Sequence, residues 1–206
     1  SFLATTGFHD LRLPETGEQD VSLCFLPLAH VFERAWPYYA LYRGMTVCYC
    51  DDPAKVIEVL QEVRPTVMCA VPRFYEKVYA TVVDRLESAS PFRRRLFTWA
   101  IAVGGDMARR TRGQQPVSAG LRLKHAVADR LVLRKLRAVL GGRLRFSALG
   151  GAPLSPEIEE FFHAAGLFVI AGYGLTETTA TVSCHERQHF RPGTVGRPLP
   201  GVEVKI

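Results

Sequence analysis

The amino-acid sequence predicts an α/β protein with a layered, mostly parallel sheet, flanking helices and a helical insertion. Three short runs rich in β-branched and apolar residues, at 21–26, 45–50 and 66–71, alternate with segments of helical apolar spacing. Because parallel neighbours need crossover connections, this alternation favours a parallel sheet. By contrast, residues 91–140 carry no strand signal. We therefore expect this segment to form a helical insertion that lies on the sheet.

Proline, glycine and acidic positions divide the first ninety residues into the expected strands and helices. Proline at 37 indicates a kink or a late start of the first helix, and Asp51, Asp52 and Pro53 form a helix start in which acidic side chains meet the positive helix end. The expected elements are strands at 21–26, 45–50 and 66–71 and helices at 31–43, from about 53 to 64 and at about 73–86.

The second half of the chain contains the insertion and two further strands. Gly113 to Gly120 separates two helices of the insertion, and a strand follows at 144–149. Ser155 and Pro156 predict a helix start, with serine as the cap and proline at the first position. This helix ends near Gly166, and a strand follows at 167–171. The last residues, 201–206, have the pattern of a strand that is cut short.

The net charge of +6 is unevenly distributed. Residues 93–145 contain 14 Lys or Arg against only Asp106 and Asp129, whereas the rest of the chain is net acidic. This basic segment is either a solvated helical face or a peripheral contact with anionic lipid headgroups or another phosphorylated ligand. Nucleic acid is not expected, because no aromatic platform or known binding motif accompanies the charge. Nothing in the sequence predicts the oligomeric state.

Apolar residues make up 48% of the chain and charged residues 22%, which is typical of a globular protein. No apolar run reaches the roughly 18 residues that a membrane-spanning helix needs, and the first residues do not resemble a signal peptide. The five cysteines form no CxxC pair, which argues against a zinc site or a disulfide framework. We therefore expect a cytoplasmic protein whose cysteines are structural. Peripheral contact with the inner membrane face is compatible with this location.

Two glycine-containing turns carry the chemistry that the sequence predicts. One turn, 150–154 (GGAPL), follows a strand, and the other, 172–179 (GYGLTETT), follows the next strand. Ligands of parallel sheets bind beyond the carboxyl ends of strands, and glycine lets backbone approach a base or a phosphate. Tyr173 offers a ring for a base, Thr176 and Thr178 offer hydroxyls for phosphates, and Glu177 is an oxygen ligand suited to Mg²⁺. Together the turns predict a nucleotide–metal site.

Several motifs resemble those of the adenylate-forming, AMP-binding superfamily. Residues 173–178 (YGLTET) resemble its YGxTE motif, and 150–154 resemble its adenine-side loop. Residues 193–201 (GTVGRPLPG), 26–34 (LPLAHVFER) and 71–77 (VPRFYEK) are similar to further segments in the same order. The last of these looks like the version found in long-chain fatty acid–CoA ligases. The resemblance covers essentially the whole chain.

The resemblance implies a role for individual residues. Thr176, Glu177 and His30 would be catalytic, with Thr176 at the α-phosphate, Glu177 on Mg²⁺ and His30 beside the acyl carboxylate. The nucleotide site would comprise Gly150, Gly151, Ala152, Pro153, Gly172, Tyr173, Gly174, Leu175 and Thr176, and the acyl site His30, Trp36, Val195 and Gly196. Ordinary core packing remains the favoured alternative for Trp36.

By the same resemblance, the parent enzyme would use ATP, Mg²⁺ and coenzyme A to activate long-chain fatty acids through an acyl-adenylate. Residues 1–206 would be a fragment of the large N-terminal domain, with the insertion at about 91–140. The phosphate loop, the ribose-binding aspartate and the C-terminal domain with its lysine would lie outside it, so we expect the fragment alone to be inactive. Alternatives are a fatty acyl-AMP ligase, another acyl- or aryl-CoA ligase, or a non-catalytic nucleotide- or membrane-binding module.

Overall fold

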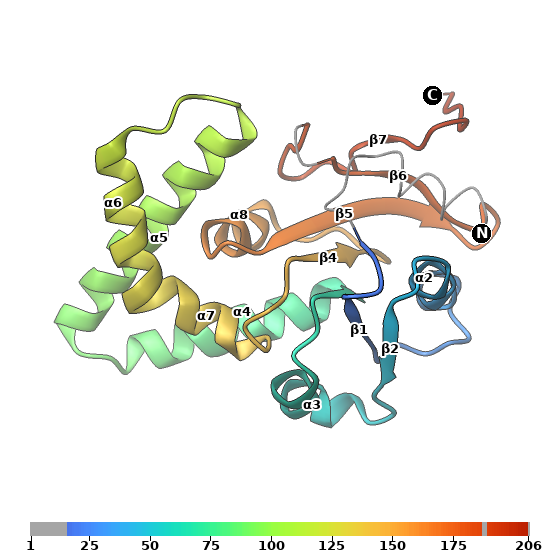
Figure 1. Ribbon diagram of the computed structural model, residues 1–206, viewed down its shortest axis with the longest axis horizontal. Coiled ribbons are helices and arrows are strands. Elements are labelled where there is room, and N and C mark those ends of the chain that lie inside the picture. Colours follow the sequence, from blue (N-terminus) through green and yellow to red (C-terminus); the bar gives the residue numbers. More distant parts are fainter. Residues whose placement is uncertain (1–15, 187–188, 206) are drawn as a thin grey trace.

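A computed structural model describes residues 16–186 and 189–205. Its central feature is a seven-stranded sheet with the order β2-β1-β3-β4-β5-β6-β7 (Figure 1). The strands are β1 (Val21–Cys24), β2 (Thr46–Tyr49), β3 (Val67–Ala70), β4 (Phe146–Leu149), β5 (Phe168–Leu175), β6 (Ala180–Cys184) and β7 (Arg197–Pro198). Along the sheet from β2 to β5, neighbouring strands pair in parallel. Strand β6 then pairs antiparallel with β5, and β7 pairs antiparallel with β6. The predicted α/β class and the mostly parallel sheet are confirmed.

The helices connect the strands close to the predicted positions. They are α2 (Val31–Tyr42), η1 (Pro53–Lys55), α3 (Val56–Val63), α4 (Pro72–Glu87), α5 (Pro91–Arg112), α6 (Ala119–Ala128), the π-helical turn η2 (Asp129–Leu133), α7 (Arg134–Val139) and α8 (Pro156–Ala164). Asp52 caps the turn η1, because its Oδ1 accepts from the Ala54 amide at 2.9 Å. Ser155 occupies the predicted cap position of α8, but its side chain makes no capping hydrogen bond.

The central strands β1, β3 and β4 are buried on both faces, as strands of parallel sheets usually are. Alternate strand residues such as Leu23, Met68 and Val169 point to one face, where residues of α3, α4 and α8 pack on them. The intervening residues, including Cys69 and Ile170, point to the other face, which α2 covers. The two-residue period of the strands thus divides the core into two layers.

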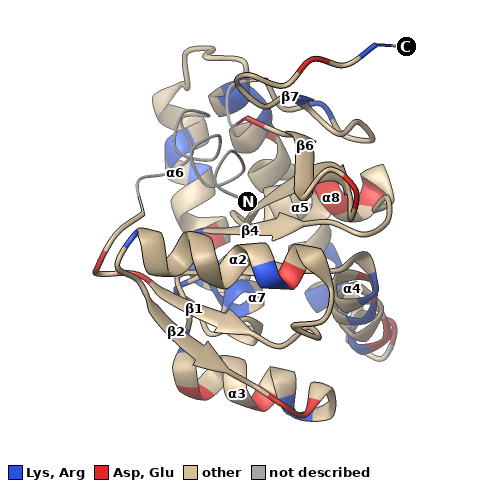
Figure 2. Cartoon of the chain, turned by 90° about the vertical axis from the view of Figure 1, so that its right-hand side faces the viewer, with Lys and Arg blue, Asp and Glu red and all other residues tan. Residues whose placement is uncertain are grey.

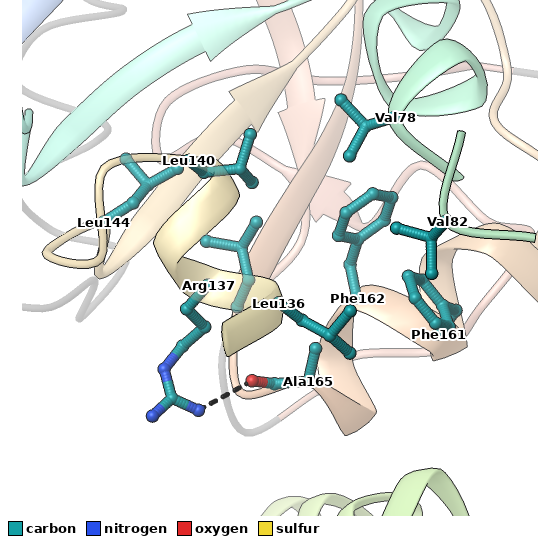
Figure 3. Close-up of a pocket in the computed structure, with 10 residues that line it drawn as sticks. Val78, Val82, Leu136, Arg137, Leu140, Leu144, Phe161, Phe162 and Ala165 are labelled. Carbon is teal, nitrogen blue, oxygen red and sulfur yellow. Dashed lines mark hydrogen bonds between the residues drawn. The ribbon is translucent and has the colours of Figure 1, made fainter. Parts of the chain in front are cut away.

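Most of the helical insertion packs on another helix rather than on the sheet. Helix α5 contacts mainly α8 and α6, so the expectation that the insertion lies on the sheet is wrong for this part, whereas Val139 and Leu140 at its end pack in the core beside the strands. Gly104 allows this close approach, because a Cβ there would lie 2.1 Å from the Ala164 carbonyl oxygen. Helix α7 returns toward the sheet, where the Arg137 Nη1 donates to the Ala165 carbonyl at 2.9 Å beside a small apolar cavity of about 10 Å³ (Figure 3).

The carboxyl-terminal part of the sheet differs from the sequence prediction. Strand β5 does not end at residue 171 but continues to Leu175 and forms an antiparallel hairpin with β6. Residues 201–205 form no strand, contrary to the prediction for 201–206; residue 206 lies outside the described residues. Hairpin pairing extends β5 because β6 supplies hydrogen-bond partners that a turn would lack.

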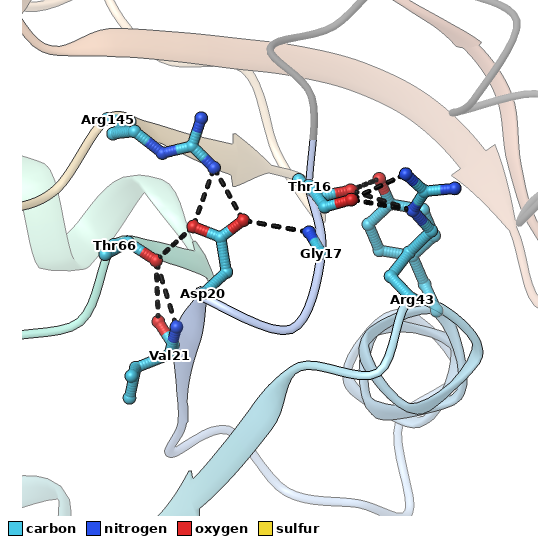
Figure 4. A network of polar contacts seen from close by, with 8 residues as sticks. Thr16, Gly17, Asp20, Val21, Arg43, Thr66 and Arg145 are labelled. Carbon is cyan, nitrogen blue, oxygen red and sulfur yellow. Dashed lines mark hydrogen bonds and ion pairs between the residues drawn. The ribbon is translucent and has the colours of Figure 1, made fainter.

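A buried carboxylate holds the amino ends of three parallel strands together. Asp20, only 1% exposed, accepts from Arg145 Nη2 at 2.7 Å, from Thr66 Oγ1 at 2.6 Å and from the Gly17 amide at 3.0 Å (Figure 4). Asp20 directly precedes β1, Thr66 directly precedes β3, and Arg145 directly precedes β4. The network therefore joins three strands at their amino ends.

Candidate functional site

A cavity of about 240 Å³ lies between the amino end of α2, the carboxyl end of β4 and the hairpin of β5 and β6. It collects most of the site residues predicted from the sequence, although they are far apart along the chain. The predicted residues that line it are His30, Gly150, Gly151, Gly172, Tyr173, Gly174, Leu175, Thr176 and Glu177. This position is the one expected for a ligand site in a parallel α/β sheet.

The hairpin between β5 and β6 presents the predicted phosphate and metal residues. Thr176 and Glu177 are exposed in the four-residue turn 176–179. The Thr178 Oγ1 accepts from the Leu175 amide at 2.9 Å and is also 3.0 Å from the Leu175 carbonyl. The hydroxyl of Thr178 thus closes the turn. The interpretation of Thr176 and Thr178 as hydroxyl donors to a phosphate remains a prediction.

The glycines of both turns are required by the packing of the chain itself. A Cβ on Gly174 would lie 1.5 Å from the Ala180 carbonyl oxygen, so only glycine lets β6 approach β5 here. A Cβ on Gly150 would meet the ring of Phe32 at 3.0 Å. Gly151 has a φ of +91°, which favours glycine for conformational reasons. These glycines thus have a role in the fold, and the room for a ligand that the sequence indicated remains a prediction.

His30 occupies the N-cap of α2 beside the cavity. Its Nδ1 accepts from the Phe32 amide at 3.3 Å, which leaves Nε2 as the protonated nitrogen of the neutral ring. The amino end of a helix carries a partial positive charge and unpaired amide groups, so it favours an anion nearby. His30 and α2 are thus suited to a carboxylate or a phosphate group.

A buried carboxyl group lies in the first turn of α2, three residues after His30. Glu33 is fully buried, and Cys69 Sγ donates to its Oε2 at 2.7 Å. Burial raises the pKa of Glu33 above its ordinary value, although hydrogen bonds from Cys69 and from the Leu26 backbone oppose this shift. The hydrogen bond from Cys69 joins α2 to β3, so Glu33 helps to fix the helix that begins after His30.

The residues present fit a magnesium ion that a nucleotide brings with it. Among the described residues, no cluster of three or more His, Cys, Asp or Glu side chains could enclose a metal. Glu177 is the one carboxylate in the cavity lining. Mg²⁺ is commonly held by one or two carboxylates together with substrate phosphates and water, so a single Glu177 suits this mode.

Five predicted residues lie outside the cavity lining. Ala152 and Pro153 are exposed beyond it, and Trp36 is only 3% exposed in the core, with its Nε1 donating to Ser22 Oγ at 2.7 Å. Val195 and Gly196 lie beside β6 instead. The Val195 carbonyl accepts from Ser183 Oγ at 2.9 Å, and the backbone of Gly196 packs directly on Cys184, which lines the cavity.

Sequence reasoning missed several residues of the cavity wall. They are Val31, Phe32, Ala148, Leu149, Ile170, Ala180, Thr181 and Cys184. Those from β4 and β5 are strand residues whose apolar character indicates only core. Those from β6 were missed because this strand was not predicted. The run ATVSC at 180–184 is rich in strand-forming residues and could have revealed it.

Over residues 2–206 the chain matches the protein family described as AMP-binding enzyme. It is 41% identical over 184 residues to the long-chain-fatty-acid–CoA ligase FadD15 of Mycobacterium bovis, covering 89% of this chain and 30% of the relative. It is 36% identical over 189 residues to the peroxisomal long chain acyl-CoA synthetase 6 of Arabidopsis thaliana, covering 91% of this chain and 26% of the relative. The chain thus spans less than a third of the length of these relatives.

Solved structures share the fold at lower identity. One is the O-succinylbenzoate coenzyme A synthetase (MenE) of Bacillus subtilis in complex with AMP, with a TM-score of 0.55, 20% identity, and coverage of 97% of this chain and 38% of that one. Another is the N-terminal domain of FACL13 from Mycobacterium tuberculosis, with a TM-score of 0.57, 18% identity, and coverage of 96% and 38%. The sequence match extends over nearly the whole chain, so this chain belongs to the AMP-binding enzyme family.

Proposed function

We propose that this chain contributes the nucleotide- and metal-binding part of an enzyme that activates long-chain fatty acids with ATP. One observation carries the proposal: a single cavity joins the Tyr173–Glu177 hairpin, the Gly150–Gly151 turn and His30. The relatives with long-chain ligase names support the choice of a fatty acid as the substrate. Within that enzyme, residues 1–206 would be part of the large N-terminal domain, with an insertion at about 91–140.

In the first step, a carboxylate oxygen of the fatty acid attacks the α-phosphorus of ATP, and the bond to the β-phosphate breaks. The products are an acyl-adenylate and pyrophosphate. The carboxylate is already ionised at neutral pH, so this step needs positioning and charge neutralisation more than a base. Thr176 would donate to the α-phosphate, Tyr173 and the two glycine turns would hold the base, and Glu177 would hold Mg²⁺. Bound Mg²⁺ would neutralise phosphate charge.

In the second step, the sulfur of coenzyme A attacks the acyl carbonyl carbon, and AMP leaves as the carbon–oxygen bond breaks. The thiol proton passes to solvent. His30 at the amino end of α2 would lie beside the acyl carboxylate in the first step and its carbonyl in the second, a place where donors favour developing negative charge. Val195 and Gly196 would border the acyl chain from the side of β6.

The deciding experiment measures pyrophosphate release by the longest natural protein that contains this chain, with palmitate, ATP and Mg²⁺, with and without coenzyme A. We expect palmitoyl-CoA as the product. The rate of pyrophosphate release should decrease on the order of 100-fold in Glu177→Ala, since one group that stabilises charge is removed. Glu58→Ala, an exposed glutamate on α3, is the matched control and should retain full activity.

Two other outcomes separate the alternatives. Acyl-AMP that accumulates without thioester, whether or not coenzyme A is present, would replace the ligase proposal by a fatty acyl-AMP ligase. The absence of fatty-acid-dependent pyrophosphate at every chain length, together with retained ATP binding, would contradict catalysis and leave a nucleotide-binding module. Cytoplasmic location and contact with a membrane through the basic segment 93–145 remain proposals as well. In the described residues, no helix is both long and apolar enough to cross a bilayer.

A further inference from the structure

The helical segment 119–139, made of α6, η2 and α7, carries a row of exposed apolar side chains. Leu123 is 69% exposed, Val127 43% and Leu131 42%. They are four residues apart, so they lie along one side of the segment. Its other side is buried, because Ala128 and Leu133 pack in a cluster with α5. The apolar row is thus additional to what the fold of the insertion requires.

Exposed basic side chains flank this row along its length. They are Arg122, Lys124, Arg130, Arg134 and Lys135. Among the described residues, no acidic group forms an ion pair with any of these five. The one acidic residue of the segment, Asp129, is paired with Arg137 at 2.7 Å. Figure 2 shows Lys and Arg positions in blue along α6 and α7.

We propose that this face of 119–139, the basic–apolar face, docks on the surface of an anionic phospholipid bilayer. A helix that lies in the interface needs a narrow apolar row, which enters the boundary between headgroups and acyl chains, and cations beside it. Long Arg and Lys side chains can keep their stems near the apolar zone while their charged ends reach lipid phosphates. The Leu123–Leu131 row and its five cations meet both requirements.

The same chemistry disfavours other occupants of this face. A second copy of the chain would bring five further cations against the first five, and like charges repel. Nucleic acid would leave the three apolar side chains without a partner, because no aromatic group among them could stack on a base. The proposal does not rest on the proposed function, since lipid binding requires neither the cavity nor Glu177.

The test is sedimentation of the purified full-length protein with phosphatidylcholine vesicles that contain or lack phosphatidylglycerol. We expect binding to the anionic vesicles alone, weakened by salt. Replacing Arg122, Arg130 and Arg134 by Gln should lower the partition coefficient about 100-fold. Replacing Leu123 and Leu131 by Gln should lower it about 10-fold at unchanged charge.

Matched controls are Lys77→Gln with Arg85→Gln, which removes two exposed cations from α4, and Leu41→Gln on α2, which removes an exposed leucine. Both controls should bind vesicles like the unmodified protein, and thermal melting should show that all variants are folded. Absence of binding to anionic vesicles, or equal binding by the α6 and control variants, would overturn the proposal. Glu177→Ala should bind vesicles normally, so this result is distinguishable from failure of the proposed function.

Discussion

The two ends of the parallel sheet use polar residues in opposite ways. At the amino end, the carboxylate of Asp20 is buried and accepts from Arg145, Thr66 and Gly17. At the carboxyl end, Thr176 and Glu177 are exposed beside a cavity. The first group is saturated with protein partners, whereas the second has capacity left for a ligand.

This difference teaches where a substitution should affect stability and where it should affect binding. A buried charge whose partners come from three strands couples those strands, and its loss leaves other polar groups unpaired. An exposed carboxylate in a hairpin turn contributes little to folding because water can replace its contacts. The following predictions test this distinction, in order of decreasing effect on stability.

The largest effect is expected for Asp20→Ala. The free energy of unfolding should fall by about 4 kcal/mol, because the substitution removes the buried carboxylate that accepts from both Arg145 and Thr66. Urea denaturation followed by circular dichroism measures this change. A double-mutant cycle with Arg145→Ala should reveal coupling between the two residues. Additive effects would contradict the network, and Asp52→Ala, at an exposed helix cap, is the control with an expected cost of about 1 kcal/mol.

The second prediction concerns the buried carboxylate of Glu159, which, in the part of the chain that the structure describes, has no ion pair with an arginine of the kind that Asp20 has with Arg145. Glu159 of α8 accepts from the Gly193 amide at 3.1 Å, but its Oε1 has no hydrogen-bond partner among the described residues. His185 Nδ1 lies 3.5 Å from Oε1, and Arg112 and Glu160 also act on this group. Burial raises the pKa of Glu159 to about 7. Ionised Glu159 therefore destabilises the fold.

The sign of the pH dependence follows from this raised pKa. The folded state binds the proton more tightly, so the contribution of Glu159 to stability is complete below pH 4.5 and is lost as pH rises toward about 7. Across this range the unmodified protein should lose about 3 kcal/mol relative to Glu159→Gln. Burial lowers the pKa of His185 to about 4, an opposite dependence that both proteins share. Denaturation of both at several pH values measures the difference, and parallel curves would contradict the prediction.

A smaller effect is expected for Trp36→Phe, which tests whether this residue belongs to the core or to the acyl site. The variant loses the hydrogen bond from Nε1 to Ser22 and some volume beside Phe146. The free energy of unfolding should therefore fall by about 2 kcal/mol. The KM for palmitate in the full-length enzyme should stay unchanged. A higher KM at unchanged stability would return Trp36 to the acyl site.

The smallest effect on stability is expected for Glu177→Gln. Its side chain is exposed, so the free energy of unfolding should change by less than about 0.5 kcal/mol. Binding of ATP should lose its dependence on Mg²⁺, because the amide no longer carries the charge that the metal needs. Calorimetric titration with ATP, with and without Mg²⁺, measures this. Retained magnesium dependence, or a large loss of stability, would contradict the comparison between the two ends of the sheet.

Local sequence signals predicted the order of the strands and helices up to β5 and most of the residues that lie together at the cavity. Alternating apolar runs, Asp52 at a helix start and glycine-rich turns after strands act within a few residues. The parallel sheet then follows from the crossover helices, and it brings both turns to one edge. For this reason Gly150, Tyr173 and Glu177 line a common cavity, as the sequence indicated.

Tertiary structure alone decided the features that depend on distant partners. Asp20 and Arg145 are 125 residues apart, and neither has a local pattern that reveals the other. The continuation of β5 past residue 171 depends on β6, and the need for glycine at 174 depends on the Ala180 carbonyl. The burial of Trp36 likewise depends on neighbours from several elements. These residues are visible in the sequence, but only the folded chain brings their partners within contact distance. Patterns over a few neighbouring residues do not show which distant residues will be in contact.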